Sequence, residues 1–234
     1  MKSLNSIFFV IVLIVAINAR AETFEVEHDH LFRSCKGKLV FGATTVEYIT
    51  DHKEHAGKWK YEDIQQLAIS SGQISILTFK SRKIAFGADQ VFNFKVLSGN
   101  PSEAFRSEME KNLARPLVSS IVPEQTQARF LIPARHRMAW SSSQGILEFG
   151  DEYLIYRSEE KDASRVWRYD DLLSMGSTGP FRLRIGALQK TGGEYGEEQN
   201  YLFDLKRRLT SEEYDFIWEQ INRRANGRNG RDLN

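Results

Sequence analysis

The sequence predicts a mainly β protein made of two diverged copies of one small domain, each ending in an α-helix. Three observations support this fold class: a repeat at a spacing of 108 residues, short strand-like segments in each copy, and an amphipathic stretch closing each copy. Hydrophobic residues make up 41% of the 234 residues and charged residues 27%, which is ordinary globular composition. The chain is therefore able to bury a core in each copy.

The repeat keeps one register without a gap from residue 28 to about residue 64. Its longest match relates residues 59–64 (WKYEDI) to residues 167–172 (WRYDDL). Later, Phe94 corresponds to Phe203, so one residue is inserted in the second copy. The other identical pairs are His28 and His136, Gly37 and Gly145, Leu39 and Leu147, Phe41 and Phe149, and Tyr48 and Tyr156.

Short runs rich in β-branched and aromatic residues, separated by turn residues, predict the strands. In the first copy they are 38–43, 46–50, 58–61, 67–70, 73–79 and 91–96. In the second copy they are 145–149, 154–158, 165–169, 181–185 and 200–205. Antiparallel sheets are the natural result of many short strands joined by tight turns.

The closing helices have recognisable start signals. Asn100 is expected to cap the first helix, with Pro101 at its first position. In the second, Thr210 and Glu213 form a capping box. Apolar residues at helical spacing predict the packed faces, which comprise Phe105, Met109 and Leu113 in the first helix, and Tyr214, Ile217, Trp218 and Ile221 in the second.

The N-terminus has the pattern of a cleaved export signal. Lys2 precedes an eleven-residue apolar run (7–17), and Ala19 and Ala21 are the small residues that a signal peptidase reads. The run is shorter than the roughly 20 residues of a membrane span, although an uncleaved anchor stays an alternative. The protein is therefore expected to be periplasmic or secreted.

The expected organisation is a signal peptide (1–21), a first domain (22–115), a proline-containing linker (116–133), a second domain (134–224) and a disordered basic tail (225–234). Removal of residues 1–21 leaves 30 basic and 31 acidic residues. That balance argues against nucleic-acid binding, which needs a surplus of basic residues.

The succession of short strands and one closing helix in about 90 residues resembles the pleckstrin-homology-like (PH-like) fold, including GRAM-type and bacterial PH-like domains. Three features carry the resemblance: the opening at residues 36–39 (KGKL), the repeated phrase at 59–64 and 167–172, and the helix after a Phe-containing last strand. The resemblance implies two half-open β-barrels, each capped by one helix. It also implies binding modules that are seldom enzymes.

Some PH-like domains bind phosphoinositides through a basic cluster near the first two strands. Arg33, Lys36 and Lys38 loosely match that cluster. The second copy has Ser141, Gln144 and Ile146 at the corresponding places and so lacks the basic cluster. Lipid binding is therefore not expected of this chain.

Histidines supply the one candidate metal site. His28, His30, His52 and His55 have ligand chemistry suited to zinc. The second copy retains only the first of them, as His136, which favours exposed turn histidines over a metal site.

Repeated aromatic pairs are the other candidate binding residues, although core packing is the favoured interpretation. These pairs are Trp59 with Tyr61 and Trp167 with Tyr169. The paired carboxylates that follow them are expected to cap turns rather than to act as acid and base. Cys35 is the single cysteine, so no intramolecular disulfide forms, and it is expected to be a structural thiol. The glycine-rich acidic loop at 190–199 is expected to be a solvated hairpin tip.

No nucleotide-binding or hydrolase motif is present, so no cofactor is expected. The sequence favours an exported, non-catalytic binding or scaffolding protein with a protein or peptide partner in the cell envelope. Strand addition at an exposed sheet edge is one possible binding mode. A metal-dependent enzyme built on the four histidines and a structural, oligomer-forming protein stay as alternatives. The oligomeric state and any membrane contact stay open.

Overall fold

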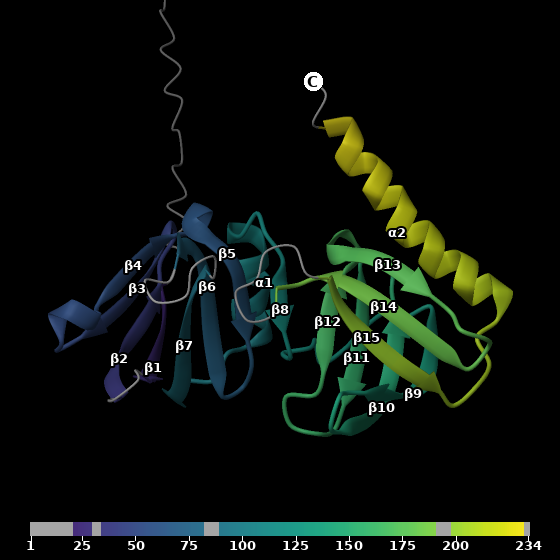
Figure 1. Ribbon diagram of the computed structural model, residues 1–234, viewed down its shortest axis with the longest axis horizontal. Helices are drawn as coiled ribbons and strands as arrows, with labels where there is room; N and C mark the ends of the chain where they lie inside the picture. Colours follow the sequence, from purple (N-terminus) through teal and green to yellow (C-terminus); the bar gives the residue numbers. More distant parts are fainter. Residues whose placement is uncertain (1–20, 30–33, 82–88, 191–197, 232–234) are drawn as a thin grey trace, which may run out of the picture.

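The computed structural model describes residues 21–29, 34–81, 89–190 and 198–231, and for 224–231 it describes the backbone alone. The protein is mainly β: one sheet of fifteen strands carries two α-helices, one in mid-chain and one at the C-terminal end (Figure 1). The first half comprises β1 (Glu22–Asp29), β2 (Ser34–Phe41), β3 (Thr45–Thr50), β4 (Gly57–Lys60), β5 (Ile64–Ile69), β6 (Gln73–Ser81), β7 (Asp89–Ser98) and α1 (Glu103–Asn112). The second half comprises β9 (Phe130–Arg137), β10 (Ser142–Phe149), β11 (Tyr153–Ser158), β12 (Arg165–Arg168), β13 (Leu172–Gly176), β14 (Arg182–Leu188), β15 (Glu198–Leu205) and α2 (Ser211–Arg231).

The two halves repeat one strand order. The sheet runs β13-β14-β15-β9-β10-β11-β12 in the second half and β5-β6-β7-β1-β2-β3-β4 in the first. The short strand β8 (Leu117–Ser119) lies between them, parallel to β5 and antiparallel to β12. Every other pairing is antiparallel, as expected of strands joined by short turns.

Four strands, β1, β8, β9 and β13, were missing from the sequence-based prediction. β1 alternates buried Phe24, Val26 and His28 with more exposed neighbours, which is the period of a half-buried strand. The expected linker 116–133 holds β8 and the start of β9, whereas an extended connector was predicted. Pro133 is tolerated in β9 because it lies just beyond the last residue paired with β15, Ala134.

The helix predictions need three corrections. Ser102, not Asn100, caps α1, and its Oγ accepts a hydrogen bond from the backbone N of Phe105 at 3.1 Å. Trp218 is 48% exposed, because the buried face of α2 is formed by Ile217, Gln220 and Ile221. The helix also continues to Arg231, where a disordered tail was expected.

The capping box of α2 is confirmed. The backbone N of Thr210 donates to Glu213 Oε2 at 3.0 Å, and the backbone N of Glu213 donates to Thr210 Oγ1 at 3.2 Å. The expected signal peptide (1–21) lies outside the described residues except for its last residue, Ala21. Among the described residues, no helix is both long and apolar enough to cross a membrane.

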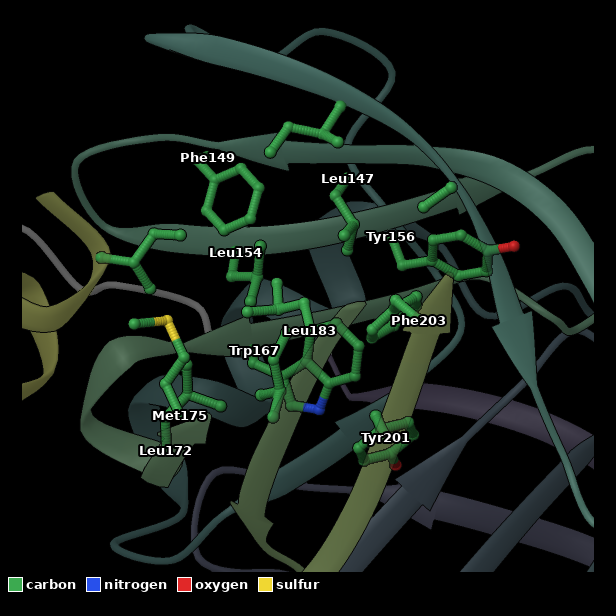
Figure 2. Packing of buried hydrophobic residues seen from close by; sticks show 14 of the residues in the cluster. Leu147, Phe149, Leu154, Tyr156, Trp167, Leu172, Met175, Leu183, Tyr201 and Phe203 are labelled. Carbon is green, nitrogen blue, oxygen red and sulfur yellow. The ribbon is translucent and has the colours of Figure 1, made fainter. Parts of the chain in front are cut away.

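Each half has its own core, and the two cores use the same aromatic construction. Tyr48 donates its hydroxyl to the carbonyl of Cys35 at 2.7 Å, and Tyr156 donates to the carbonyl of Ser143 at 2.8 Å. Figure 2 shows Tyr156 with Trp167, Tyr201 and Phe203 in the core of the second half. The identities of the repeat are thus mostly residues of these two cores.

The repeated glycine is required by this construction. A Cβ on Gly37 would lie 2.3 Å from the carbonyl oxygen of Ile49 and 2.7 Å from the Tyr48 ring. A Cβ on Gly145 would meet the carbonyl of Arg157 and the Tyr156 ring at the same two distances. Backbone cannot yield as a flexible side chain does, so each tyrosine ring needs a glycine across the strand pair.

Polar contacts also join the two halves. Asp162, at φ 56°, accepts hydrogen bonds at Oδ1 from Ser71 N and Ser71 Oγ, both at 3.0 Å, and from Ser120 Oγ at 3.2 Å. Gln66 and the backbone of Lys190 exchange two hydrogen bonds, of 2.7 and 3.1 Å. These contacts fix the second half beside the β5–β8 pair of the first.

We predict that Gly37→Ala and Gly145→Ala each lower the free energy of unfolding by about 2 kcal/mol, the usual effect of overpacking a filled core. Urea unfolding checks this. Gly72→Ala is the matched control, because no atom lies within 4 Å of its added Cβ, and it should leave the free energy nearly unchanged. Equal stability of all four proteins would contradict the packing argument.

Candidate binding cleft

A cleft of about 520 Å³ opens at one end of the second half, where β9 ends and β12 and β15 begin. This volume lies within the range of roughly 300–1,000 Å³ that is common for ligand pockets. The cleft is lined by polar side chains and by Met138. The polar side chains include those of His136, Arg165, Gln189, Asn200 and Tyr201.

Arg165 places a positive charge in the cleft. Its Nη1 donates to the carbonyl oxygens of Asp162 at 2.6 Å and Ser164 at 2.7 Å, which fixes the guanidinium against the backbone. Its Nε is buried and has no hydrogen-bond partner in the part of the chain that the structure describes. A buried N–H without a partner is unusual and marks a place where a ligand acceptor is favourable.

His136 supplies a second buried nitrogen without a described hydrogen-bond partner. The residue is 7% exposed, and its Nδ1 has no hydrogen-bond partner among the described residues. Burial, together with the charge of Arg165, lowers the pKa of His136 from 6.5 to about 4. The imidazole is therefore neutral at pH 7.

Tyr201 lies on the core side of the cleft. Its hydroxyl donates to Gln189 Oε1, and its ring packs against Trp167 with the ring centroids 4.8 Å apart. Burial raises the pKa of Tyr201, so its hydroxyl keeps its proton at physiological pH. The cleft thus combines one fixed cation, neutral polar groups and an aromatic wall.

The corresponding end of the first half is built differently. His28 Nδ1 lies 2.7 Å from the carbonyl oxygen of Asn93, a contact for which His136 has no counterpart. Gly57 stands in the repeat where Arg165 stands, and Phe92 where Tyr201 stands. Cys35 Sγ lies 3.0 Å from His55 Nδ1, and this pair joins β2 to the turn before β4. At this end of the domain, the cation and the two unpartnered nitrogens therefore belong to the second copy, whereas the third such nitrogen among the described residues, Arg106 Nε, lies in α1 of the first half.

The histidine cluster is only partly brought together. His52 and His55 have ring centroids 5.8 Å apart, whereas His28 packs on Tyr48 and Phe94 in the core. His30 lies outside the described residues. Among the residues that are described, no group of three or more His, Cys, Asp or Glu is arranged to hold a metal ion.

The predicted aromatic candidates lie in the two cores. Trp59, Tyr61, Trp167 and Tyr169 are at most 8% exposed. Tyr61 donates to the carbonyl of Gly42 at 2.8 Å and Tyr169 to that of Gly150 at 3.0 Å, so the repeated tyrosines make the same structural hydrogen bond.

The basic candidates and the glycine-rich loop are described only in part. Lys36 and Lys38 lie on β2, and neither lines the cleft. Arg33 lies outside the described residues, as does most of the acidic loop, residues 191–197.

Sequence reasoning missed Arg165 and Tyr201. The available signal was the departure of the second copy from the first at these two positions, where Gly57 and Phe92 are replaced by a cation and a phenol.

Solved structures with a distant likeness to this chain include the following two. The C-terminal domain of an unknown protein from Leishmania infantum is 13% identical, with a TM-score of 0.32 over 41% of this chain and 84% of that one. The Spt16D Pob3N heterodimer is 12% identical, with a TM-score of 0.32 over 72% of this chain and 84% of that one. Comparisons with protein-family models and with curated proteins give no match. At these scores neither likeness bears on function.

We predict a pH-dependent contribution of His136 to stability. The unfolded imidazole titrates near pH 6.5 and the folded one near 4, so the unfolded chain takes up the proton first as the pH falls. The contribution is fully present above pH 6.5 and is lost towards pH 4, by at most about 3 kcal/mol.

Urea unfolding of wild type and His136→Phe at pH 7 and at pH 4 measures this contribution. The difference in unfolding free energy between the two proteins should change between these pH values in favour of the variant. The exposed His52→Gln variant should follow wild type. A pH-independent difference between wild type and His136→Phe would contradict the buried neutral state.

Proposed function

We propose that the chain is an exported, non-catalytic binding protein built from two PH-like domains. Each half has seven strands, with β5 or β13 at one edge and β4 or β12 at the other, and one helix follows the last strand. This arrangement supports the PH-like interpretation. The export signal in the first 21 residues supports a periplasmic or secreted location.

The observation that carries the proposed activity is the Arg165 guanidinium, which lines the second-half cleft and is fixed there by the carbonyl oxygens of Asp162 and Ser164. The described residues that line this cleft include two arginines and no acidic residue. Guanidinium groups bind carboxylates through charge-assisted hydrogen bonds. The ligand group that fits is therefore a carboxylate, which the neutral His136 and Asn200 would hold by further hydrogen bonds.

The rim supports a protein or peptide as the source of that carboxylate. Trp140 is fully exposed at the β9–β10 turn, beside Met138 and Ala139 of the cleft. Exposed tryptophan beside a pocket is typical of the residues that dominate protein interfaces. We therefore propose that an acidic side chain or a chain terminus of a partner protein enters the cleft while Trp140 packs on the neighbouring surface.

A peptide array tests this function. Hexapeptides containing Asp or Glu should bind wild type about tenfold more tightly than the same peptides with Asn or Gln, as expected for one charge-assisted contact of about 1.5 kcal/mol. Arg165→Gln should remove this preference. Arg184→Gln is the matched control, because Arg184 is exposed on β14 and outside the cleft. An equal preference in all three proteins would overturn the proposal.

A further inference from the structure

The strand β8 shows how the outer edge of a half is filled. Directly after β8, the backbone N of Ser120 donates a hydrogen bond to the carbonyl oxygen of Ile69, the last residue of β5, at 3.0 Å. Leu67, Ala68 and Ile69 of β5 pair in parallel with residues 117–119. Leu117 and Ser119 are buried, so β8 presents alternate side chains to the interior.

β13 is the counterpart of β5 in the second half. Both strands follow a single 3-10 turn, and both begin with the same irregularity: the register shifts between Ile64 and Gln66 in β5 and between Leu172 and Ser174 in β13. The repeat register places Met175 where Leu67 stands. The two edges are therefore the same structural element.

No strand covers the outer edge of β13 in the part of the chain that the structure describes, since the sheet ends there. In the first half the chain leaves α1 at Asn112 and returns as β8, but α2 continues as helix to Arg231. Figure 1 shows α2 passing over β13 at the end of the sheet. α1 contacts the added strand β8, whereas α2 contacts β13 itself.

The two ends of the sheet differ in their protection against pairing. β4, at the other end, carries Lys58 and Lys60, and charged residues are a usual means of blocking an exposed edge. β13 (LLSMG) carries no charge, and its Leu173 is 46% exposed. The β13 edge is thus the uncharged one of the two.

We infer that the edge of β13 binds an extended peptide segment of a partner protein, which adds to the sheet in parallel as β8 adds to β5. The segment that fits has an apolar residue followed two positions later by a small residue, as Leu117 and Ser119 are in β8. Backbone hydrogen bonds supply affinity in this mode, and the alternate side chains supply specificity. The inference is independent of the carboxylate cleft.

A synthetic peptide with the sequence of residues 115–122 (RPLVSSIV) is the probe, because it contains the strand that fits the first edge. Fluorescence anisotropy with the purified chain should show saturable binding. Amide hydrogen exchange should slow at residues 172–177 when the peptide binds. Slowing at β4 instead, or no saturable binding, would overturn the inference.

N-methylated peptides test whether the backbone makes the contact. The Ser120 N–H faces β5, so alternate amides (Val118 and Ser120) face the sheet and that of Ser119 faces away. Methylation at the position of Ser120 should weaken binding about tenfold, because it removes one backbone hydrogen bond and adds bulk at the edge. Methylation at the position of Ser119 should change binding less than about twofold. Equal effects at both positions would contradict strand addition.

Discussion

The pairing of β8 with both halves is the constraint on which the architecture depends. This strand of three residues lies parallel to β5 and contacts β12, and without it the molecule would have two separate sheets. Asp162, just before β12, reinforces the same junction by accepting hydrogen bonds from Ser71, which follows β5, and from Ser120, which follows β8. Because both ends of the β8 segment are fixed, the two halves are held in one relative orientation.

Duplication explains why the functional features are found in differences between the copies. The identical residues, such as Gly37 and Gly145 with their facing tyrosines, satisfy the packing of the two cores. Where the copies differ, one of them carries groups that packing does not require. Among the described residues, Arg165 leaves a buried nitrogen without a partner, whereas Gly57 has no side chain to do so. In the same way, β8 fills the edge of β5, and no described strand fills that of β13.

Much of the fold could be predicted from the sequence. The repeat register gave the correspondence of the two halves, and the Thr210–Glu213 box gave the start of α2, because these signals are local. β8 could not be predicted, since three residues are too few to show a period and their pairing joins segments far apart in the chain. The exposure of Trp218 was also not predictable, because Gln220 takes a buried position that its polarity does not suggest. The cleft was missed for a related reason: the two nitrogens without partners are a property of the packed molecule and not of any motif.

The central claim is that the second half holds a carboxylate at Arg165. The most direct measurement is the NMR signal of the Arg165 Nε–H group, assigned by its loss in Arg165→Gln, during titration with a short acidic peptide. The account predicts a saturable shift of this signal, together with the His136 ring signals, while those of His52 stay unchanged. Saturable binding of the peptide that leaves the Arg165 signal unmoved would contradict it.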